Sequence, residues 1–322
     1  MAWDGIPWFV ENTAASEETM RLIVEAAVCG GEGIIGPADL RVTALDVPAA
    51  AVQVGVGAMI AKRRASVGGG SQSYAARMPT VEQVDIEPAG ADGPRSDLVV
   101  ARVEDPYGGE VWPEPEDPLV GPYVFTRVVT DVPVGTTRIQ DIEPGSTAIT
   151  LARIDLPTGA TTVTAAMVTD LREMARPRTQ SARRYVYGAW STPDDVGPIT
   201  AEWETFPLGS LWSEKVPEWA THATVHALIT GLLHPDTTEA RGELRVTLGD
   251  AHGPGMPYAA VQAGRQAVQV GNRFLLTPED RGEVLNLILE GIGTDGFTGV
   301  LRADTATVVS VEVTYEQAPV SV

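Results

Sequence analysis

The sequence predicts a mainly β protein, with an α+β N-terminal domain that contains one amphipathic helix and a C-terminal antiparallel β-sandwich that is jelly-roll-like. Three observations predict this fold class. Short runs of alternating or β-branched residues recur along the chain, glycine and proline (33 and 24 of 322 residues) separate them, and one segment alone follows helical spacing. The length favours two domains.

The predicted helix covers residues 16–29. Ser16 can cap it, and Glu17 and Glu18 place negative charge in the first turn, where the helix dipole favours it. Gly30 and Gly31 end the segment. A buried stripe is expected from the apolar residues at helical spacing, which are Met20, Ile23, Val24 and Ala27.

The rest of the first domain, which we place at residues 1–174, is predicted to consist of strands. The clearest strand patterns are LVVARVE (98–104), YVFTRVVT (123–130) and TAITLARI (147–154). Residues 105–122 contain five prolines and five acidic residues, so we expect a surface excursion there rather than a strand or a helix.

Residues 175–199 are predicted to be an arginine-rich linker, and residues 200–322 a second domain. Its strand patterns follow one another at short intervals with turn residues between them, which is typical of a sandwich or barrel. EVLNLILE (283–290) is ambiguous, because its apolar positions also suit a helix face. The clearest alternation is in GELRVTLG (242–249) and ATVVSVEVTY (306–315).

Charge and composition limit the classes of partner. A net charge of −20 argues against binding nucleic acid or an anionic membrane, and no run of 18 apolar residues predicts membrane insertion. The segment 1–18 lacks the basic and apolar regions of a signal peptide. One cysteine rules out an internal disulfide and a cysteine-based metal cluster.

No motif predicts a catalytic, cofactor-binding or metal-binding residue. His222 and His226 lie in a strand pattern, where four residues span ~13 Å, which is too far for one ion. The loop GGGSQS (68–73) lacks the lysine and hydroxyl of a phosphate-binding loop. Carboxylate pairs for glycoside hydrolysis remain open, because such pairs meet in space rather than in sequence.

Aromatic residues supply the candidate binding and interface sites. Trp203, Trp212 and Trp219 either stack on sugars or seal the sandwich and the seam between subunits. We assign to a candidate subunit interface these three and the residues of the apolar N-terminal leader, which are Trp3, Trp8 and Phe9. In the loop 249–258, the candidate receptor contacts are His252, Met256 and Tyr258.

The stretch ITLARIDLPTGATTVTAAMVTDLR (149–172) resembles the end of the N-terminal domain of minor tail or baseplate (tail-tip) proteins of tailed bacteriophages. The resemblance covers roughly residues 15–173. It includes, in order, the early helix and the segments GPADLRV (36–42), AVQVGVGAMI (51–60) and RSDLVVARVED (95–105). It implies a domain that docks on the tail, followed by a β-sandwich that is often trimeric and directed at the host.

From this resemblance we expect a structural, non-enzymatic minor tail protein without cofactors. It would be made in the host cytoplasm and located in the virion, at the tail tip or baseplate. Its expected partners are its own copies in a homotrimer, other tail proteins and a host cell-surface glycan. Two alternatives stay open: a tail-associated enzyme that acts on host cell-wall glycan, and a lectin-like receptor-binding module.

Overall fold

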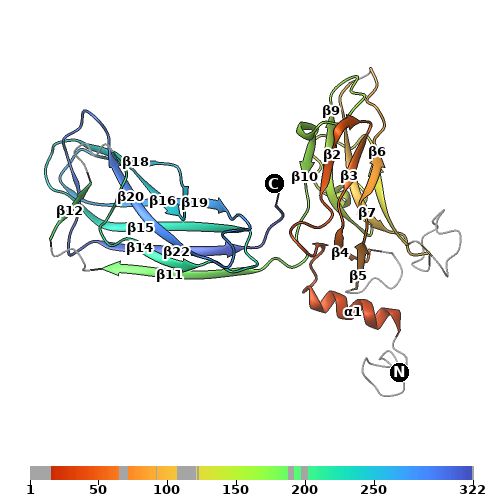
Figure 1. Cartoon of the computed structure of the whole chain (residues 1–322), viewed down its shortest axis with the longest axis horizontal. Coiled ribbons are helices and arrows are strands. Elements are labelled where there is room, and N and C mark those ends of the chain that lie inside the picture. Colours follow the sequence, from red (N-terminus) through yellow and green to blue (C-terminus); the bar gives the residue numbers. More distant parts are fainter. Residues whose placement is uncertain are drawn as a thin grey trace, which may run out of the picture. The chain divides into compact units, whose positions relative to one another are not determined.

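The computed structural model describes residues 16–64, 72–91, 93–106, 121, 123–187, 192–196 and 202–320. It divides into two compact units (Figure 1), which are treated separately below. Unit 1 comprises Met1–Pro177 and Pro319–Val322, and unit 2 comprises Arg178–Ala318. The strands of both units confirm the prediction of a mainly β protein.

Unit 1 contains one α-helix, ten strands and two short 3₁₀ helices within the described residues. The strands form three antiparallel sheets with the orders β1-β4-β5, β2-β3-β6 and β10-β9-β7-β8. The elements are α1 (Glu17–Ala27), β1 (Gly33–Ile34), β2 (Val42–Ala49), β3 (Ala51–Val54), β4 (Gly57–Lys62), β5 (Ser73–Met78), β6 (Glu82–Asp85), β7 (Arg95–Val103), β8 (Val124–Val129), η1 (Ile139–Asp141), β9 (Ala148–Leu156), η2 (Ala165–Met167) and β10 (Val168–Asp170).

Strand β7 explains why LVVARV is apolar without alternation. Val99 and Ala101 belong to the larger apolar cluster of unit 1, whereas Leu98 and Val100 belong to a second, smaller cluster on the opposite face of the strand. A strand that is covered on both faces needs apolar side chains at every position. β7 is therefore an inner strand of its sheet, paired with β9 on one side and with β8 on the other.

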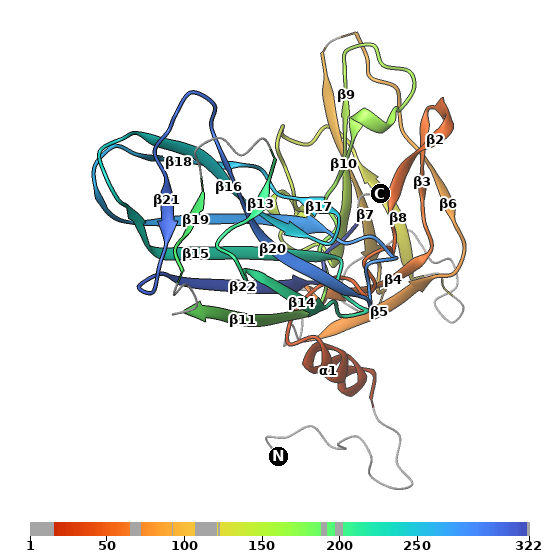
Figure 2. The same cartoon turned by 60° about the vertical axis from the view of Figure 1, so that its left-hand side comes forward.

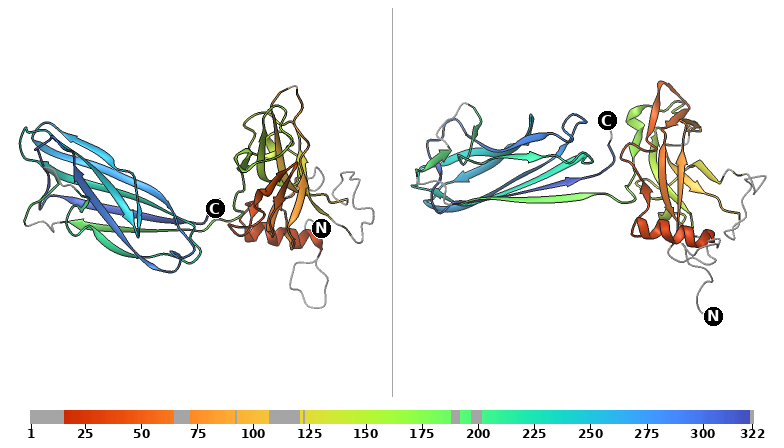
Figure 3. Two further views of the ribbon diagram at one scale, coloured as in Figure 1. Left: turned by 45° about the horizontal axis from the view of Figure 1, so that its top comes forward. Right: turned by 60° about the horizontal axis from the view of Figure 1, so that its bottom comes forward.

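Helix α1 begins as predicted but packs differently. The Ser16 hydroxyl accepts a hydrogen bond from the Thr19 backbone N–H, which confirms the cap. The predicted buried stripe is wrong, because Met20 is 46% exposed and the residue that is buried is Glu25. The Glu25 carboxylate accepts a hydrogen bond from the Ser73 hydroxyl, so a polar contact holds the helix against β5. Figure 3 shows the helix, in red, next to the strands of unit 1. No helix in the described residues is long and apolar enough to cross a membrane.

Unit 2 is a sandwich of two antiparallel sheets (Figure 2). The sheet that we call the β15 sheet has the order β11-β22-β15-β21-β12, with β19 also paired to β15. The β20 sheet has the order β13-β20-β16-β17, with β14 on β20 and β18 on β16. The strands are β11 (Thr179–Tyr187), β12 (Asp194–Val196), β13 (Glu204–Thr205), β14 (Leu211–Lys215), β15 (His222–His234), β16 (Ala240–Leu248), β17 (Ala251–His252), β18 (Met256–Ala260), β19 (Gly264–Leu275), β20 (Val284–Gly293), β21 (Leu301–Ala303) and β22 (Val308–Glu316).

Strand β15 contributes core side chains on both sides of a β-bulge. Ala223, Val225, Ala227 and Ile229 point into the core, and after a β-bulge Leu232 does so as well. Gly231 lies at this bulge with φ +75°, and its insertion shifts the alternation by one residue. The bulge keeps both halves of a long strand in the same core.

The predicted linker is wrong for residues 179–187, which form β11. This strand pairs with β22 from Thr179↔Glu316 to Tyr187↔Val308. It lies at the edge of its sheet. Alternate side chains of its second half are partly buried, and the side chains between them face outward, where polar residues are tolerated. This explains why its composition is typical of a linker. EVLNLILE, which was ambiguous, lies in strand β20.

Candidate binding surfaces

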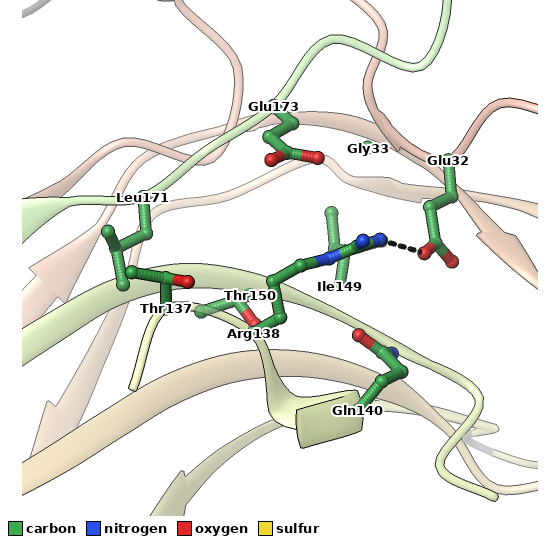
Figure 4. A pocket seen from close by; sticks show the side chains of 9 residues that line it. All are labelled: Glu32, Gly33, Thr137, Arg138, Gln140, Ile149, Thr150, Leu171 and Glu173. Carbon is green, nitrogen blue, oxygen red and sulfur yellow. Dashed lines mark hydrogen bonds and ion pairs between the residues drawn. The ribbon is translucent and has the colours of Figure 1, made fainter. Parts of the chain in front are cut away.

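A small polar pocket lies in unit 1 (Figure 4). The Arg138 guanidinium reaches across it to Glu32, with Nη2 2.9 Å from Oε1. Its volume is about 20 Å³, which accommodates about one water molecule. The lining residues are Glu32, Gly33, Thr137, Arg138, Gln140, Ile149, Thr150, Leu171 and Glu173. The pocket is too small for an organic ligand.

Glu32 also binds a second arginine. Arg64 Nη1 and Nη2 donate to the two oxygens of the Glu32 carboxylate at 2.7 and 2.6 Å, a bidentate pair. The Glu32 and Arg64 side chains are largely buried, at 12% and 18% exposed. The charged groups at this pocket therefore join distant segments of unit 1 to one another, which is a structural role.

A larger groove of about 380 Å³ lies among strands β4 to β8 of unit 1. Its apolar part includes the buried side chains of Leu40, Met59 and Ala101. Charged side chains, Arg77, Glu82 and Arg127, also line it. The groove combines apolar and charged walls, as protein–protein contact sites do.

Glu104 lies beside this groove and is fully buried (0% exposed). Arg102 Nη2 and Arg127 Nε donate to its Oε1 at 2.7 and 2.9 Å, and the Arg127 guanidinium also stacks on Phe125 at 4.3 Å. Burial by itself raises the pKa of Glu104, but the hydrogen bonds from Arg127 and Arg102 outweigh it, so the pKa lies below its ordinary value. The carboxylate is thus a structural anion.

In unit 2, a polar cluster lies on the outer face of the β20 sheet. The Arg245 guanidinium stacks on the Trp203 ring at 4.2 Å and donates from Nε to Glu290 Oε2 at 2.7 Å. The Thr247 hydroxyl donates to the same Glu290 oxygen at 2.6 Å. Strands β16 and β20 hold these three polar residues, because Arg245 and Glu290 are register partners. We call these residues and His252 the Glu290 cluster, whose members are Trp203, Arg245, Thr247, His252 and Glu290.

His252 completes the Glu290 cluster from the neighbouring strand β17. Its Nδ1 lies 3.1 Å from Thr247 Oγ1. Because the single hydroxyl proton of Thr247 is donated to Glu290, the Nδ1–H of His252 must be the donor to Thr247. This places a proton on Nδ1 of His252 and makes its ring a donor within the cluster.

The hydrogen bonds of the Glu290 cluster set the protonation of its carboxyl group. Burial raises the pKa of Glu290, but donation from Thr247 and Arg245 outweighs it and places the pKa below the ordinary value of 4.5. Folding therefore favours the ionised form. The resulting stabilisation is complete above pH 4.5 and is lost as the pH falls through the pKa of the folded state.

We expect Thr247→Val to raise the pKa of Glu290 in the folded protein, because valine keeps the shape of threonine but cannot donate. A carboxyl-carbon NMR titration measures this pKa directly. Thr314→Val is the matched control, since the Thr314 hydroxyl bonds Ser181 and no carboxylate. An unchanged titration of Glu290 in Thr247→Val would contradict the assignment of the hydroxyl as donor.

The three predicted receptor contacts lie in different environments. The His252 side chain is 53% exposed and Met256 is 40% exposed, so both are accessible. Tyr258 is a correction: it is 6% exposed and packs in the core, beneath Gly242, where a Cβ would lie 2.4 Å from the Tyr258 hydroxyl oxygen. Burial raises the pKa of Tyr258 to about 12. Its side chain is not available to a receptor.

The predicted interface tryptophans of unit 2 lie in two different environments. Trp212 and Trp219 are partly buried and pack against the core of unit 2. Trp203 instead belongs to the Glu290 cluster on the outside. Trp3, Trp8 and Phe9 lie outside the described residues.

Sequence reasoning missed Arg245, Thr247 and Glu290, because nothing in their spacing shows that β16 and β20 are neighbours. It also missed Tyr185 and Tyr187, which are 55% and 74% exposed. The sequence feature that could have identified them is their spacing of two residues, because side chains two apart in a strand lie on the same face. Within the described residues, no group of three His, Cys, Asp or Glu side chains is arranged to hold a metal ion.

Comparisons with known proteins give little further information. No protein-family model and no curated protein match the sequence. Among solved structures, a chain from the structure of infectious bursal disease virus, Gx strain, aligns with this chain at 12% identity. The alignment covers 90% of this chain and 73% of the viral chain, with a TM-score of 0.24. The VP2 subviral particle of the same virus aligns at 10% identity over 89% and 74%, with a TM-score of 0.25. BuGH86 in complex with neoagarooctaose aligns at 12% identity over 83% and 33%, with a TM-score of 0.21. At these TM-scores the alignments define no shared fold.

Proposed function

We propose that this chain is a structural protein of a virus particle, namely a minor tail or baseplate protein of a tailed bacteriophage. Unit 1 attaches to the tail, and unit 2 recognises the host or carries other tail proteins. The chain acts by assembly and binding rather than by catalysis.

One observation carries the proposal: the segments that resemble tail proteins all contribute to one compact unit. GPADLRV leads into β2, AVQVGVGAMI forms β3 and β4, RSDLVVARVED forms β7, and the stretch from residue 149 forms β9 and β10. Val42, Val54, Met59, Val99 and Leu151 from these segments share one apolar core. A sequence resemblance that spans one complete core is what a transferable docking domain requires.

The polar groups of the described residues support a non-catalytic role. Three of the carboxylates in or beside these sites, Glu32, Glu104 and Glu290, each accept hydrogen bonds from arginine. Their charges are balanced within the fold. Carboxylates held in this way join strands and segments of the fold to one another.

The proposal is tested on intact particles of the phage that encodes the chain. We expect mass spectrometry of purified particles to detect it, and gold particles bound to a tag on the chain to mark one end of the tail. The purified protein should have about three times the chain mass of 34.1 kDa in mass photometry, as a homotrimer. Particles that lack the chain would refute the structural role, and a 34.1 kDa species at micromolar concentration would refute the trimer.

A further inference from the structure

The outer face of the β15 sheet carries an exposed aromatic and apolar patch. Tyr185 and Tyr187 of β11 are 55% and 74% exposed, Val308 of β22 is 36% exposed and Leu228 of β15 is 43% exposed. We call these four residues the tyrosine platform. None of them belongs to the core between the two sheets.

Strand register makes the platform continuous. Tyr187 lies opposite Val308, which lies opposite Thr230, and Tyr185 lies opposite Ser310, which lies opposite Leu228. Figure 2 shows the three strands side by side. The two tyrosines are about 6.8 Å apart along β11, and neighbouring strands are about 4.8 Å apart. Hydroxyl groups of Ser310 and Thr230 thus alternate with apolar and aromatic side chains.

The platform has a fixed border. The Arg183 guanidinium binds Glu312 on β22 and contacts the hydroxyl of Tyr185. Arg183 and Glu312 neutralise each other, so the charged residues next to the platform add no net charge. Tyr185 is positioned by this contact before any ligand arrives, which reduces the entropy lost on binding.

The area of the platform limits the kind of partner that it can bind. Two rows of residues across three strands cover roughly 100–200 Å², by strand spacing alone. A stable protein interface buries about 800 Å² on each partner. The platform is therefore too small for a second copy of this chain, but it has the size and spacing of a short run of sugar rings.

We propose that the tyrosine platform binds an uncharged glycan. The apolar C–H faces of the sugar rings stack on Tyr185 and Tyr187, and sugar hydroxyls bond to Ser310, Thr230 and the tyrosine hydroxyls. The Arg183–Glu312 ion pair balances the charge beside the platform within the described residues, which favours a neutral polysaccharide. This inference rests on the proposed function, because it names the host-surface chemistry that unit 2 recognises.

The test is affinity gel electrophoresis of the full chain in gels that contain dextran, mannan, galactomannan or xyloglucan. We expect at least one of these to retard the protein, and the double variant Tyr185→Ala/Tyr187→Ala to lose about tenfold or more in affinity. The matched control is Leu211→Ala/Val284→Ala, which removes side chains 48% and 59% exposed on the β20 sheet and should leave the affinity unchanged. Far-UV circular dichroism establishes that both double variants are folded.

Two results would overturn the inference: no retardation by any of the four polysaccharides, or equal retardation of the wild type and the folded tyrosine double variant. In the second case, a change in the oligomeric mass of the variant would identify the platform as a protein contact instead. Incorporation into particles is measured separately. A chain that binds glycan but is missing from particles refutes only the proposed function, and a chain present in particles that binds no glycan refutes only this inference.

Discussion

Replacing Gly231 with alanine will destabilise unit 2 by about 3 kcal/mol, as the sum of two costs of about 1–2 kcal/mol each. The first cost is conformational, because Gly231 has φ +75°, where a residue with a Cβ is strained. The second is steric: an added Cβ would lie 2.4 Å from the backbone oxygen of Ala306, which cannot move without disturbing β22. The bulge in β15 would have to change to relieve both.

Urea unfolding followed by tryptophan fluorescence measures this loss, since Trp203, Trp212 and Trp219 are partly buried in unit 2. Gly296→Ala is the matched control, because Gly296 has φ +87° and no atom within 4 Å of an added Cβ. It should show the conformational cost alone, of about 1–2 kcal/mol. Equal losses in the two variants would show that the contact with Ala306 contributes nothing.

Glu104→Gln will destabilise unit 1 by about 2–3 kcal/mol at neutral pH. Glutamine keeps the size of the buried side chain but removes the charge that Arg102 and Arg127 share. It also directs its own N–H groups toward arginine donors. We expect a smaller loss of stability than for a fully buried ion pair, because the two arginine side chains are 20% and 31% exposed and keep some contact with water.

The pH dependence identifies the cause. Since folding lowers the pKa of Glu104, its stabilisation is complete above the ordinary value of 4.5 and is lost as the pH falls through the pKa of the folded state. The difference between wild type and Glu104→Gln, measured by calorimetry, should therefore be largest near pH 7 and shrink in acid. Asp155→Asn is the control: that side chain is 43% exposed, and we expect a loss under about 1 kcal/mol. A difference for Glu104→Gln that is constant with pH would contradict this account.

The elements whose patterns are local could be predicted from the sequence. Ser16 begins a helix because a hydroxyl satisfies a free N–H at the first turn, and this depends only on residues three apart. The alternation of Val309, Val311 and Val313 predicted a strand with one buried face, which β22 has. The resemblance to tail proteins likewise depended on strand patterns that lie within a single unit.

The binding surfaces could not be predicted in the same way. Glu290 and Arg245 are 45 residues apart and meet only because β16 and β20 pair in one register. The tyrosine platform needs three strands that are far apart in the chain, β11, β15 and β22. Tyr258 lies in the segment 249–258, whose sequence predicts an exposed loop. The contact with Gly242, which no spacing shows, places it in the core.

The sequence by itself determined the fold class, the start of helix α1 and most of the described strands, because caps and side-chain alternation depend on residues close together in the chain. The tertiary structure alone decided that residues 179–187 form an edge strand, that Glu25 rather than Met20 holds the helix, and which side chains share an outer face. Hydrogen-bonded register joins residues far apart in the chain, and the free energy that selects it comes from the packed core rather than from any local pattern.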